Sequence, residues 1–335
     1  MQNHLRSMAL LPLLYLSLAL SAQQGKPAAG YDRASRATVL HVAQVYVAAD
    51  IDSQHITTVT PGHEVVIMGR SSGWVRVFAN TDVEEQREED TPEFLEDENV
   101  TPKSGWIRDK GVLGAATANG ATLLYGAAAT AEAEAAEPHA PKTAAGSAYL
   151  LYRRMAEYFP DSPLAPEAAW RSADIRWQLG LADARTLPSA KEQDPNLRPR
   201  MYDNGLKKVM KNYPGTKYAA LAAYDLLAAK LCGDWQGLPK CPAQESDLYE
   251  KYASQFPDSP KAAEALWNAA YRQGVLVSMY AAEENKKHTD SAAQHAHAIA
   301  EIMKQKYPQS DYTLRATTLV YKVEQSIPIY GNDRD

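Results

Sequence analysis

Three histidines and a glutamate near the C-terminal end of the chain have the spacing best suited to binding a metal ion. His288, His295 and His297 precede Glu301, and His297 and Glu301 are four positions apart, which places them on one face of a helix. A metal site would need a further firm ligand in a matching position. A solvent-exposed, histidine-rich helix start accounts for the same residues, so we predict neither a metal site nor a cofactor here.

The chain contains two cysteines, Cys232 and Cys241, nine positions apart in a segment with glycine and proline. A disulfide that closes so short a loop contributes roughly 2–3 kcal/mol to stability. A zinc site is the first alternative, but two thiols with no histidine between them supply too few ligands. A redox-active pair is the second, but its usual spacing is C-x-x-C. The sequence therefore predicts a structural disulfide without a catalytic role.

Several motifs that accompany catalysis or nucleotide binding are missing from the sequence. It lacks the zinc-protease pattern H-E-x-x-H, the phosphate-binding loop G-x-x-x-x-G-K-[ST] and the dinucleotide pattern G-x-G-x-x-G. The net charge is −6 and no basic run stands out, which argues against a protein that grips nucleic acid phosphates. We expect a protein that is not an enzyme and does not bind nucleic acid.

Residues 1–22 have the features of a signal peptide. A short basic segment precedes an apolar run at residues 8–20, and small residues then suit cleavage after Ser21 or Ala22. The alternative, a buried N-terminal helix, is disfavoured because Pro12 interrupts the run. No cysteine follows the run, so we expect an exported protein, periplasmic or secreted, that is not lipidated. No later stretch suits a spanning helix, so we expect no membrane insertion.

Alanine and valine are distributed unevenly along the chain. Residues 115–335 contain 44 of the 55 alanines, whereas 12 of the 17 valines fall within residues 38–112. Because alanine favours helices and β-branched residues favour strands, this break predicts an α+β protein of two domains. Within residues 36–113 we expect a small β-barrel, because short strands alternate there with glycine and proline turns. The expected strands are residues 38–47, 56–59, 63–69 and 74–78, and one that begins at 104.

The pattern PGHEVVIMGRSSGWVRV at residues 61–77, followed by GWI at residues 105–107, resembles a bacterial SH3 domain. Members of that family commonly attach exported proteins to the cell wall or to peptides. The resemblance therefore implies peptidoglycan or peptide as a ligand of this domain. Three aromatic residues are the candidate ligand-binding side chains, although the two tryptophans suit the barrel core equally well: Tyr46, Trp74 and Trp106.

Two segments interrupt this scheme. Residues 81–102 hold ten acidic residues and one arginine, a charge of −9, and no D-x-D-x-D-G calcium loop. We interpret them as a solvated acidic insertion within the β domain. Residues 114–146 are rich in alanine, with scattered glycine and proline, and we interpret them as a linker that contains at most a transient helix.

The helical part repeats one phrase, an aromatic residue followed by proline and, after one more residue, serine or threonine. It begins at Phe159, Tyr213, Phe256 and Tyr307. Proline ends one helix, and the hydroxyl residue caps the next, with Pro163 and Pro260 at the first helical position in two repeats. We predict helix-pair packing at aligned small and aromatic positions: Ala168, Ala222, Ala265 and Ala316 nine residues after each start, and Trp170, Tyr224 and Trp267 eleven residues after.

The segments YRRMAEYFPDSP (residues 152–163) and YEKYASQFPDSP (residues 249–260) carry a further resemblance. They resemble the tetratricopeptide-like repeats of outer-membrane assembly lipoproteins of the BamD type and of the periplasmic Tol–Pal coordinator. The resemblance implies a helical solenoid of four helix pairs over residues 147–327. It also implies that this part binds a protein partner and does not catalyse a reaction.

These expectations combine into a non-catalytic scaffold or adaptor of the cell envelope. Its helical repeats would bind an envelope protein, and its SH3-like domain would contact cell wall or peptide. An accessory or targeting subunit of a cell-wall hydrolase system is the alternative that the sequence leaves open.

Overall fold

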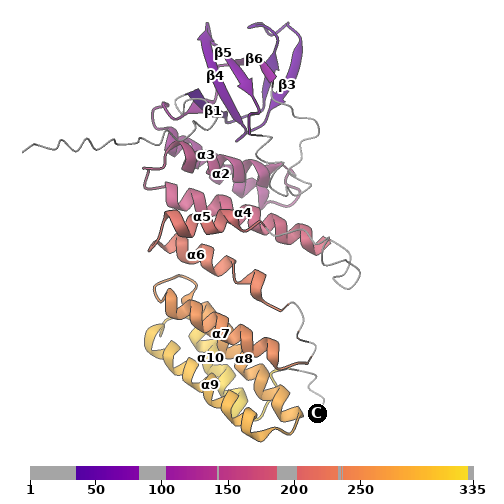
Figure 1. Ribbon diagram of the computed structural model, residues 1–335, viewed down its shortest axis with the longest axis vertical. Coiled ribbons are helices and arrows are strands. Elements are labelled where there is room, and N and C mark those ends of the chain that lie inside the picture. Colours follow the sequence, from indigo (N-terminus) through magenta and orange to yellow (C-terminus); the bar gives the residue numbers. More distant parts are fainter. Residues whose placement is uncertain are drawn as a thin grey trace, which may run out of the picture.

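The computed structural model describes residues 35–82, 103–141, 143–186, 202–232, 235 and 237–330. A β-sheet lies at one end of an elongated molecule, and helices are stacked from the sheet to the other end (Figure 1). The predicted order, a β domain followed by a helical domain, is confirmed. The signal-peptide prediction and most of the acidic insertion lie outside the described residues.

The β domain is one antiparallel sheet with a valine-rich core. In β5, Val75 and Val77 are fully buried whereas Arg76 between them is exposed, which is the two-residue period of a half-buried strand. The strands are β1 (Arg36–Val39), β2 (Ala43–Tyr46), β3 (His55–Val59), β4 (Glu64–Ser71), β5 (Trp74–Ala79), β6 (Lys103–Arg108) and β7 (Val112–Gly114).

The sheet differs from the predicted barrel in two respects. The order of the strands is β3-β2-β6-β5-β4-β1-β7, so β3 and β7 form two edges and the described strands do not close into a barrel. Closure requires the edge strands to pair with each other, and the three-residue β7 pairs with β1. The segment 38–47 is also two strands, because the chain leaves the ladder at residues 40–42.

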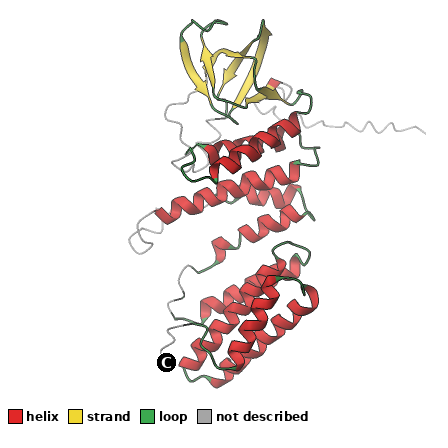
Figure 2. Cartoon of the chain, turned by 180° about the vertical axis from the view of Figure 1, so that it is seen from behind, coloured by secondary structure: helices red, strands yellow, loops and turns green. Residues whose placement is uncertain are grey.

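The remaining described elements are helices, which lie across or oblique to the long axis of the molecule and are stacked one after another along it (Figure 2). No helix in these described ranges combines the length and apolarity needed to cross a membrane. The elements are α2 (Gly120–Ala135), α3 (Ala144–Tyr158), α4 (Ala165–Thr186), α5 (Asn204–Asn212), α6 (Lys217–Asp225), η3 (Ala228–Lys230), α7 (Lys240–Gln255), α8 (Ala262–Ala282), α9 (Lys286–Lys306) and α10 (Asp311–Glu324).

The repeated phrase lies at the turn inside each of four helix pairs, α3–α4, α5–α6, α7–α8 and α9–α10. A methyl side chain at the aligned alanine position lets the two helices of a pair approach closely. The four aligned alanines are all fully buried: Ala168, Ala222, Ala265 and Ala316.

The hydroxyl residues of the phrase cap helices, but in two different ways. Thr216 and Ser310 directly precede α6 and α10, and each accepts a hydrogen bond from a backbone N–H of the first turn. Ser162 and Ser259 also accept from backbone N–H groups, but a further turn separates them from α4 and α8. The prolines that follow lie in that turn and not at the first helical position, which corrects the prediction for Pro163 and Pro260.

The alanine-rich segment predicted as a linker contains a packed helix, α2, and that prediction is wrong. Leu124 and Ala128, four positions apart, are fully buried against α3. The hydroxyl of Tyr152 donates to Glu132 at 2.7 Å across the same interface. Alanine has the highest helix propensity, and its small side chain permits close helix packing, so the same composition suits a buried helix.

A buried arginine joins the sheet to α3. The side chain of Arg154 is 1% exposed. Its Nη2 lies 2.5 Å from Oδ2 of Asp82, and its Nε donates to the carbonyl oxygen of Gly62 at 3.1 Å. Gly62 has a φ of 90°, and a Cβ there would lie 2.4 Å from the Cβ of Leu150, so glycine is required where the turn meets the helix.

Asp82 belongs to the segment predicted as a solvated acidic loop, and for this residue the prediction is wrong. Its side chain is 1% exposed and accepts from the backbone N–H of Glu64 at 3.1 Å. Burial opposes ionisation of Asp82, but the positive charge of Arg154 and the hydrogen bond from His63 hold its pKa well below the usual range. The first acid of the insertion therefore fixes the two domains together.

Candidate functional site

The candidate site is a groove in the first part of the helical stack. It is formed by α3, α4, α5 and the segment just before α5, and it encloses about 370 Å³. Cavities of this size are typical of ligand-binding sites in proteins. The side chains that determine its chemistry are Tyr149, Arg153, Glu157, Arg176, Tyr202, Lys208, Asn212 and Tyr213.

Tyrosines and a buried arginine form the walls of the groove. Tyr149 is 6% exposed and Arg176 is 4% exposed, whereas Tyr202 is half-buried. The Arg176 guanidinium carbon lies 4.3 Å from the ring centre of Tyr202 and 5.8 Å from that of Tyr149. Stacking against two aromatic rings holds the guanidinium plane in a fixed orientation at the groove.

The charges that line the groove are mainly positive. Three basic residues, Arg153, Arg176 and Lys208, face one acid, Glu157. Arg153 Nε lies 2.7 Å from Glu157 Oε1. Burial opposes ionisation of the Glu157 carboxyl group, but the positive charges of Arg154 and Arg153 lower its pKa. Glu157 pairs with Arg153 and Arg154, so its charge is balanced within the protein. The exposed Lys208 adds a further positive charge to the groove.

Small residues set the distance between the helices at the groove. A Cβ on Gly205 would lie 3.1 Å from the Cβ of Ala173, so α5 passes close to α4 at this point. Ser172 of α4 donates to the carbonyl oxygen of Tyr149 at 3.0 Å and ties α4 to α3. The groove is therefore preformed by the packing of its helices.

The three aromatic residues proposed for the β domain lie together, but one of them is buried. Tyr46 and Trp74 have ring centres 5.6 Å apart in an edge-to-face arrangement. Tyr46 pairs with Trp106 in the β2–β6 ladder, and both are half-buried. Trp74 is 5% exposed and lies beneath the guanidinium of Arg108, 4.1 Å from its ring centre, so only Tyr46 and Trp106 offer accessible ring surface.

Two of the three aligned aromatic residues of the repeats, Trp170 and Tyr224, connect successive helix pairs. Trp170 Nε1 donates to Asp225 at 3.1 Å, from the first pair to the second. Tyr224 donates to Glu264 at 3.0 Å, from the second pair to the third. Trp267 stacks obliquely on Tyr271, which belongs to its own helix.

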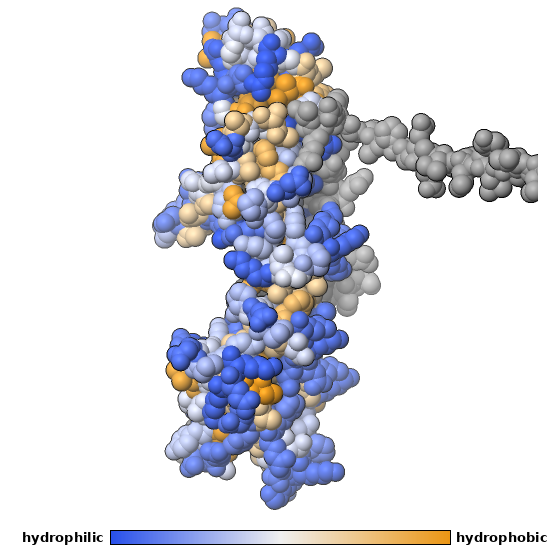
Figure 3. All heavy atoms as spheres, turned by 90° about the vertical axis from the view of Figure 1, so that its left-hand side faces the viewer, coloured by the Kyte–Doolittle hydropathy of each residue, from blue (hydrophilic) through white to orange (hydrophobic). Residues whose placement is uncertain are grey.

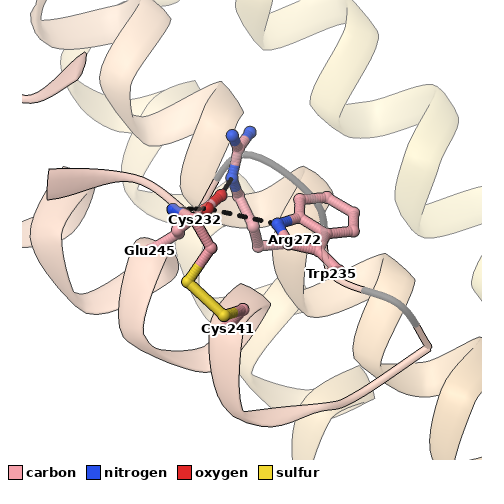
Figure 4. Close-up of a disulfide and its surroundings, with 5 residues drawn as sticks. All are labelled: Cys232, Trp235, Cys241, Glu245 and Arg272. Atoms are coloured by element: carbon pink, nitrogen blue, oxygen red, sulfur yellow. Dashed lines mark hydrogen bonds and ion pairs between the residues drawn. A yellow bond between two sulfur atoms is a disulfide. The ribbon is translucent and has the colours of Figure 1, made fainter. Parts of the chain in front are cut away.

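Cys232 and Cys241 form the predicted disulfide, with their Cα atoms 6.0 Å apart. Beside it, the buried carboxylate of Glu245 accepts from the backbone N–H of Cys232 and from the indole N–H of Trp235 (Figure 4). Arg272 Nε lies 2.9 Å from the other oxygen of Glu245. The disulfide and this carboxylate together hold Trp235 against α8.

Two of the three clustered histidines contact carboxylates of other helices. His295 Nε2 lies 3.0 Å from Oε1 of Glu250 on α7, and His297 Nε2 lies 3.4 Å from Oε1 of Glu324 on α10. A hydrogen bond to Glu250 raises the pKa of His295. Within the part of the chain that the structure describes, no group of three or more His, Cys, Asp or Glu is placed to hold a metal ion.

Residues 69–73 match the pattern G-x-S-x-G of hydrolase nucleophiles. In hydrolases this serine lies on a sharp turn between a strand and a helix. Here Ser71 ends β4, and the chain turns through Ser72 and Gly73, both with positive φ, into β5. The pattern therefore belongs to an exposed β-hairpin.

Sequence reasoning did not find the groove, because its residues come from three helices and an irregular segment. The nearest signal was the spacing of Tyr149 and Arg153, four positions apart on one helix. Tyr202 and Lys208 lie outside the quoted repeat phrase. No protein-family model matches the chain, and no curated protein matches it either.

Proposed function

We propose that this protein is a non-catalytic adaptor of the cell envelope, which holds an acidic segment of a protein partner in the α3–α5 groove. The observation that carries the proposal is the groove of about 370 Å³ with tyrosine walls and three basic residues against one acidic residue. Guanidinium and ammonium groups bind carboxylates through charge-assisted hydrogen bonds. Tyrosine rings supply contact area for the neighbouring side chains.

The stack of helix pairs supports a binding role over a catalytic one. In a helical stack the first helices of successive pairs line a continuous surface, which suits an extended polypeptide ligand. Here α3 and α5 are such helices, and both contribute to the groove. The side chains of the groove are held by packing and by ion pairs within the protein, which limits the ordering cost of binding.

Export is part of the same proposal. The features of residues 1–22 favour it, and so does the disulfide, since disulfides persist in oxidising compartments. The β domain has a smaller role in this proposal. Its contact with cell wall or peptide would rest on Tyr46 and Trp106, because Trp74 is buried.

Site-specific photocrosslinking in the native envelope tests the proposal. The photoreactive residue p-benzoylphenylalanine replaces Asn212, which lines the groove, or Lys251, an exposed residue of α7. We expect a discrete crosslinked protein from position 212 and not from position 251, and we expect the additional change Lys208→Glu to suppress it. The same crosslinks from both positions, or a crosslink unaffected by Lys208→Glu, would contradict the proposal.

A further inference from the structure

A second pocket lies at the far end of the helical stack. It is formed by α8, α10 and the segment at residues 328–329, and it encloses about 380 Å³. The residues that determine its character are Trp267, Tyr271, Arg315, Thr318, Leu319 and Lys322. It shares no residue with the groove.

The pocket lies where the last repeat departs from the aromatic series. In the first two pairs, Trp170 and Tyr224 are each covered by side chains of the next pair. In the third pair Trp267 occupies the same position, but the fourth pair has Thr318 where the earlier pairs have an aromatic residue. Trp267 and Thr318 both line the pocket.

The charge of the stack also reverses at this point. Eight positions after the aromatic start, the first and third pairs carry Glu167 and Glu264, which accept hydrogen bonds from tyrosine hydroxyls at 2.7 Å and 3.0 Å. The fourth pair carries Arg315 at that position. Lys322 lies seven residues further along α10 on the same face.

Nothing in the described chain neutralises these two cations. Arg315 and Lys322 are exposed, and among the described residues neither has a carboxylate oxygen within 4.0 Å. Among the described residues that line the pocket, none is acidic. The guanidinium of Arg315 lies 5.2 Å from the ring centre of Tyr312, a contact that orients it without compensating its charge.

The walls of the pocket are preformed. The ring centres of Trp267 and Tyr271 are 6.0 Å apart. The ring centre of Trp235, in the disulfide loop, lies 6.5 Å from that of Tyr271. On the other side, the backbone N–H of Ile329 donates to Ser278 of α8 at 2.9 Å. A preformed pocket that combines an accessible tryptophan with two cations suits a carboxylate that has an apolar neighbour.

We propose that the α8–α10 pocket is a second binding site, which takes an acidic segment of a protein partner. A carboxylate of the segment pairs with Arg315 and Lys322, and an adjacent apolar side chain packs on Trp267. Where Glu167 and Glu264 accept hydrogen bonds from tyrosines in the first and third pairs, the fourth pair carries the basic Arg315. The carboxylate of the ligand would therefore pair with this basic side chain. This proposal does not rest on the function assigned to the groove.

The test uses the full chain and a fluorescein-labelled hexapeptide of alternating glutamate and phenylalanine. Binding is measured by fluorescence anisotropy in the Lys208→Glu background, in which we expect binding in the groove to be at least tenfold weaker. We expect the double change Arg315→Gln and Lys322→Gln to weaken binding at least tenfold, and Thr318→Trp, which fills the pocket, to do the same. The matched control Lys306→Gln, on the exposed end of α9, is expected to change binding less than twofold.

A site-specific readout completes the experiment. The chain has six tryptophans, and the indole N–H signal of Trp267 is assigned in NMR spectra by its loss in Trp267→Phe. We expect this signal to shift on addition of the peptide, and less so with a glutamine-for-glutamate peptide. Equal binding by the pocket variants and the control would overturn the proposal. Binding that arises only after removal of residues 331–335 would also overturn it, and would assign the pocket to the end of this chain.

Discussion

Two buried arginines on neighbouring helices, Arg154 of α3 and Arg176 of α4, are 1% and 4% exposed. Arg154 is enclosed by Asp82, Glu157 and a backbone carbonyl, and it joins the sheet to the helices. Arg176 stacks on tyrosines in the wall of a groove. Similar burial therefore accompanies two different surroundings: carboxylates and a backbone carbonyl enclose Arg154, whereas tyrosine rings lie beside Arg176 in the wall of the groove.

Removing the enclosed arginine tests the structural half of this comparison and has the largest expected effect. Arg154→Ala leaves Asp82 buried without its main counter-charge, so we expect a loss of about 3–5 kcal/mol in the free energy of unfolding. Urea denaturation measures it. The control is Arg153→Ala, whose partner Glu157 is 38% exposed, with an expected loss below about 1 kcal/mol. Equal losses in the two variants would show that burial does not distinguish these ion pairs.

The disulfide, like Arg154, stabilises the fold. We expect its removal to cause the next largest loss in the free energy of unfolding. The double change Cys232→Ser/Cys241→Ser removes the disulfide, whose cysteines are nine positions apart. We expect the free energy of unfolding to fall by roughly 2–3 kcal/mol. Thermal unfolding with and without reductant measures it, and reductant should leave the double variant unchanged. Free thiols at both positions in the unreduced exported protein would contradict the assignment.

Overpacking a helix pair tests whether the aligned alanines are structural as well. Ala265 is fully buried between helices, so Ala265→Leu should cost on the order of 1–3 kcal/mol. Ala281→Leu, at an exposed position of the same helix, is the matched control and should have little effect. If Ala265→Leu leaves the urea midpoint unchanged, the aligned position is not a packing position.

A pH-dependent effect extends the comparison to buried acids. Burial, together with the charge of Asp174, raises the pKa of Asp225 from 3.8 to about 7. Because its pKa is raised in the folded protein, the protonated Asp225 side chain contributes to the free energy of unfolding. That contribution is fully present below pH 3.8 and is lost as the pH rises through about 7. Because Asp225 is partly exposed, we expect a loss of about 1–2 kcal/mol.

The variant Asp225→Asn carries no charge at either pH and still accepts from the indole of Trp170. Its unfolding free energy should change less than that of the unmodified protein between pH 4 and pH 8, and it should be the more stable of the two at pH 8. Asp161→Asn, at an exposed position, serves as the control. Parallel pH profiles for the protein and Asp225→Asn would refute the effect.

The helix pairs could be predicted from the sequence because their signals are local. Proline after Phe159 or Tyr307 ends one helix, and the hydroxyl residue that follows caps the next, so a few residues determine each turn. The buried alanines could be aligned for the same reason. The disulfide could also be predicted, because its two cysteines are close in sequence.

The junction and the groove could not be predicted, because their contacts are distant in sequence. Arg154 and Asp82 are 72 positions apart, and Asp82 stands at the start of an acidic run that suggests exposure. The alanine-rich composition of α2 fits both a linker and a packed helix, and only its contacts with α3 decide between the two. The face seen in Figure 3 is mainly hydrophilic, with separate apolar areas, so hydropathy does not single out a site on that face.

The most direct test of the central claim is the affinity of the groove for the protein recovered by crosslinking at position 212. Titration calorimetry would compare the full chain with Lys208→Glu and with the control Lys251→Glu. We expect at least tenfold weaker binding for Lys208→Glu, less than a twofold change for Lys251→Glu, and unchanged unfolding free energies for both. Undiminished affinity of the folded Lys208→Glu variant would contradict this expectation.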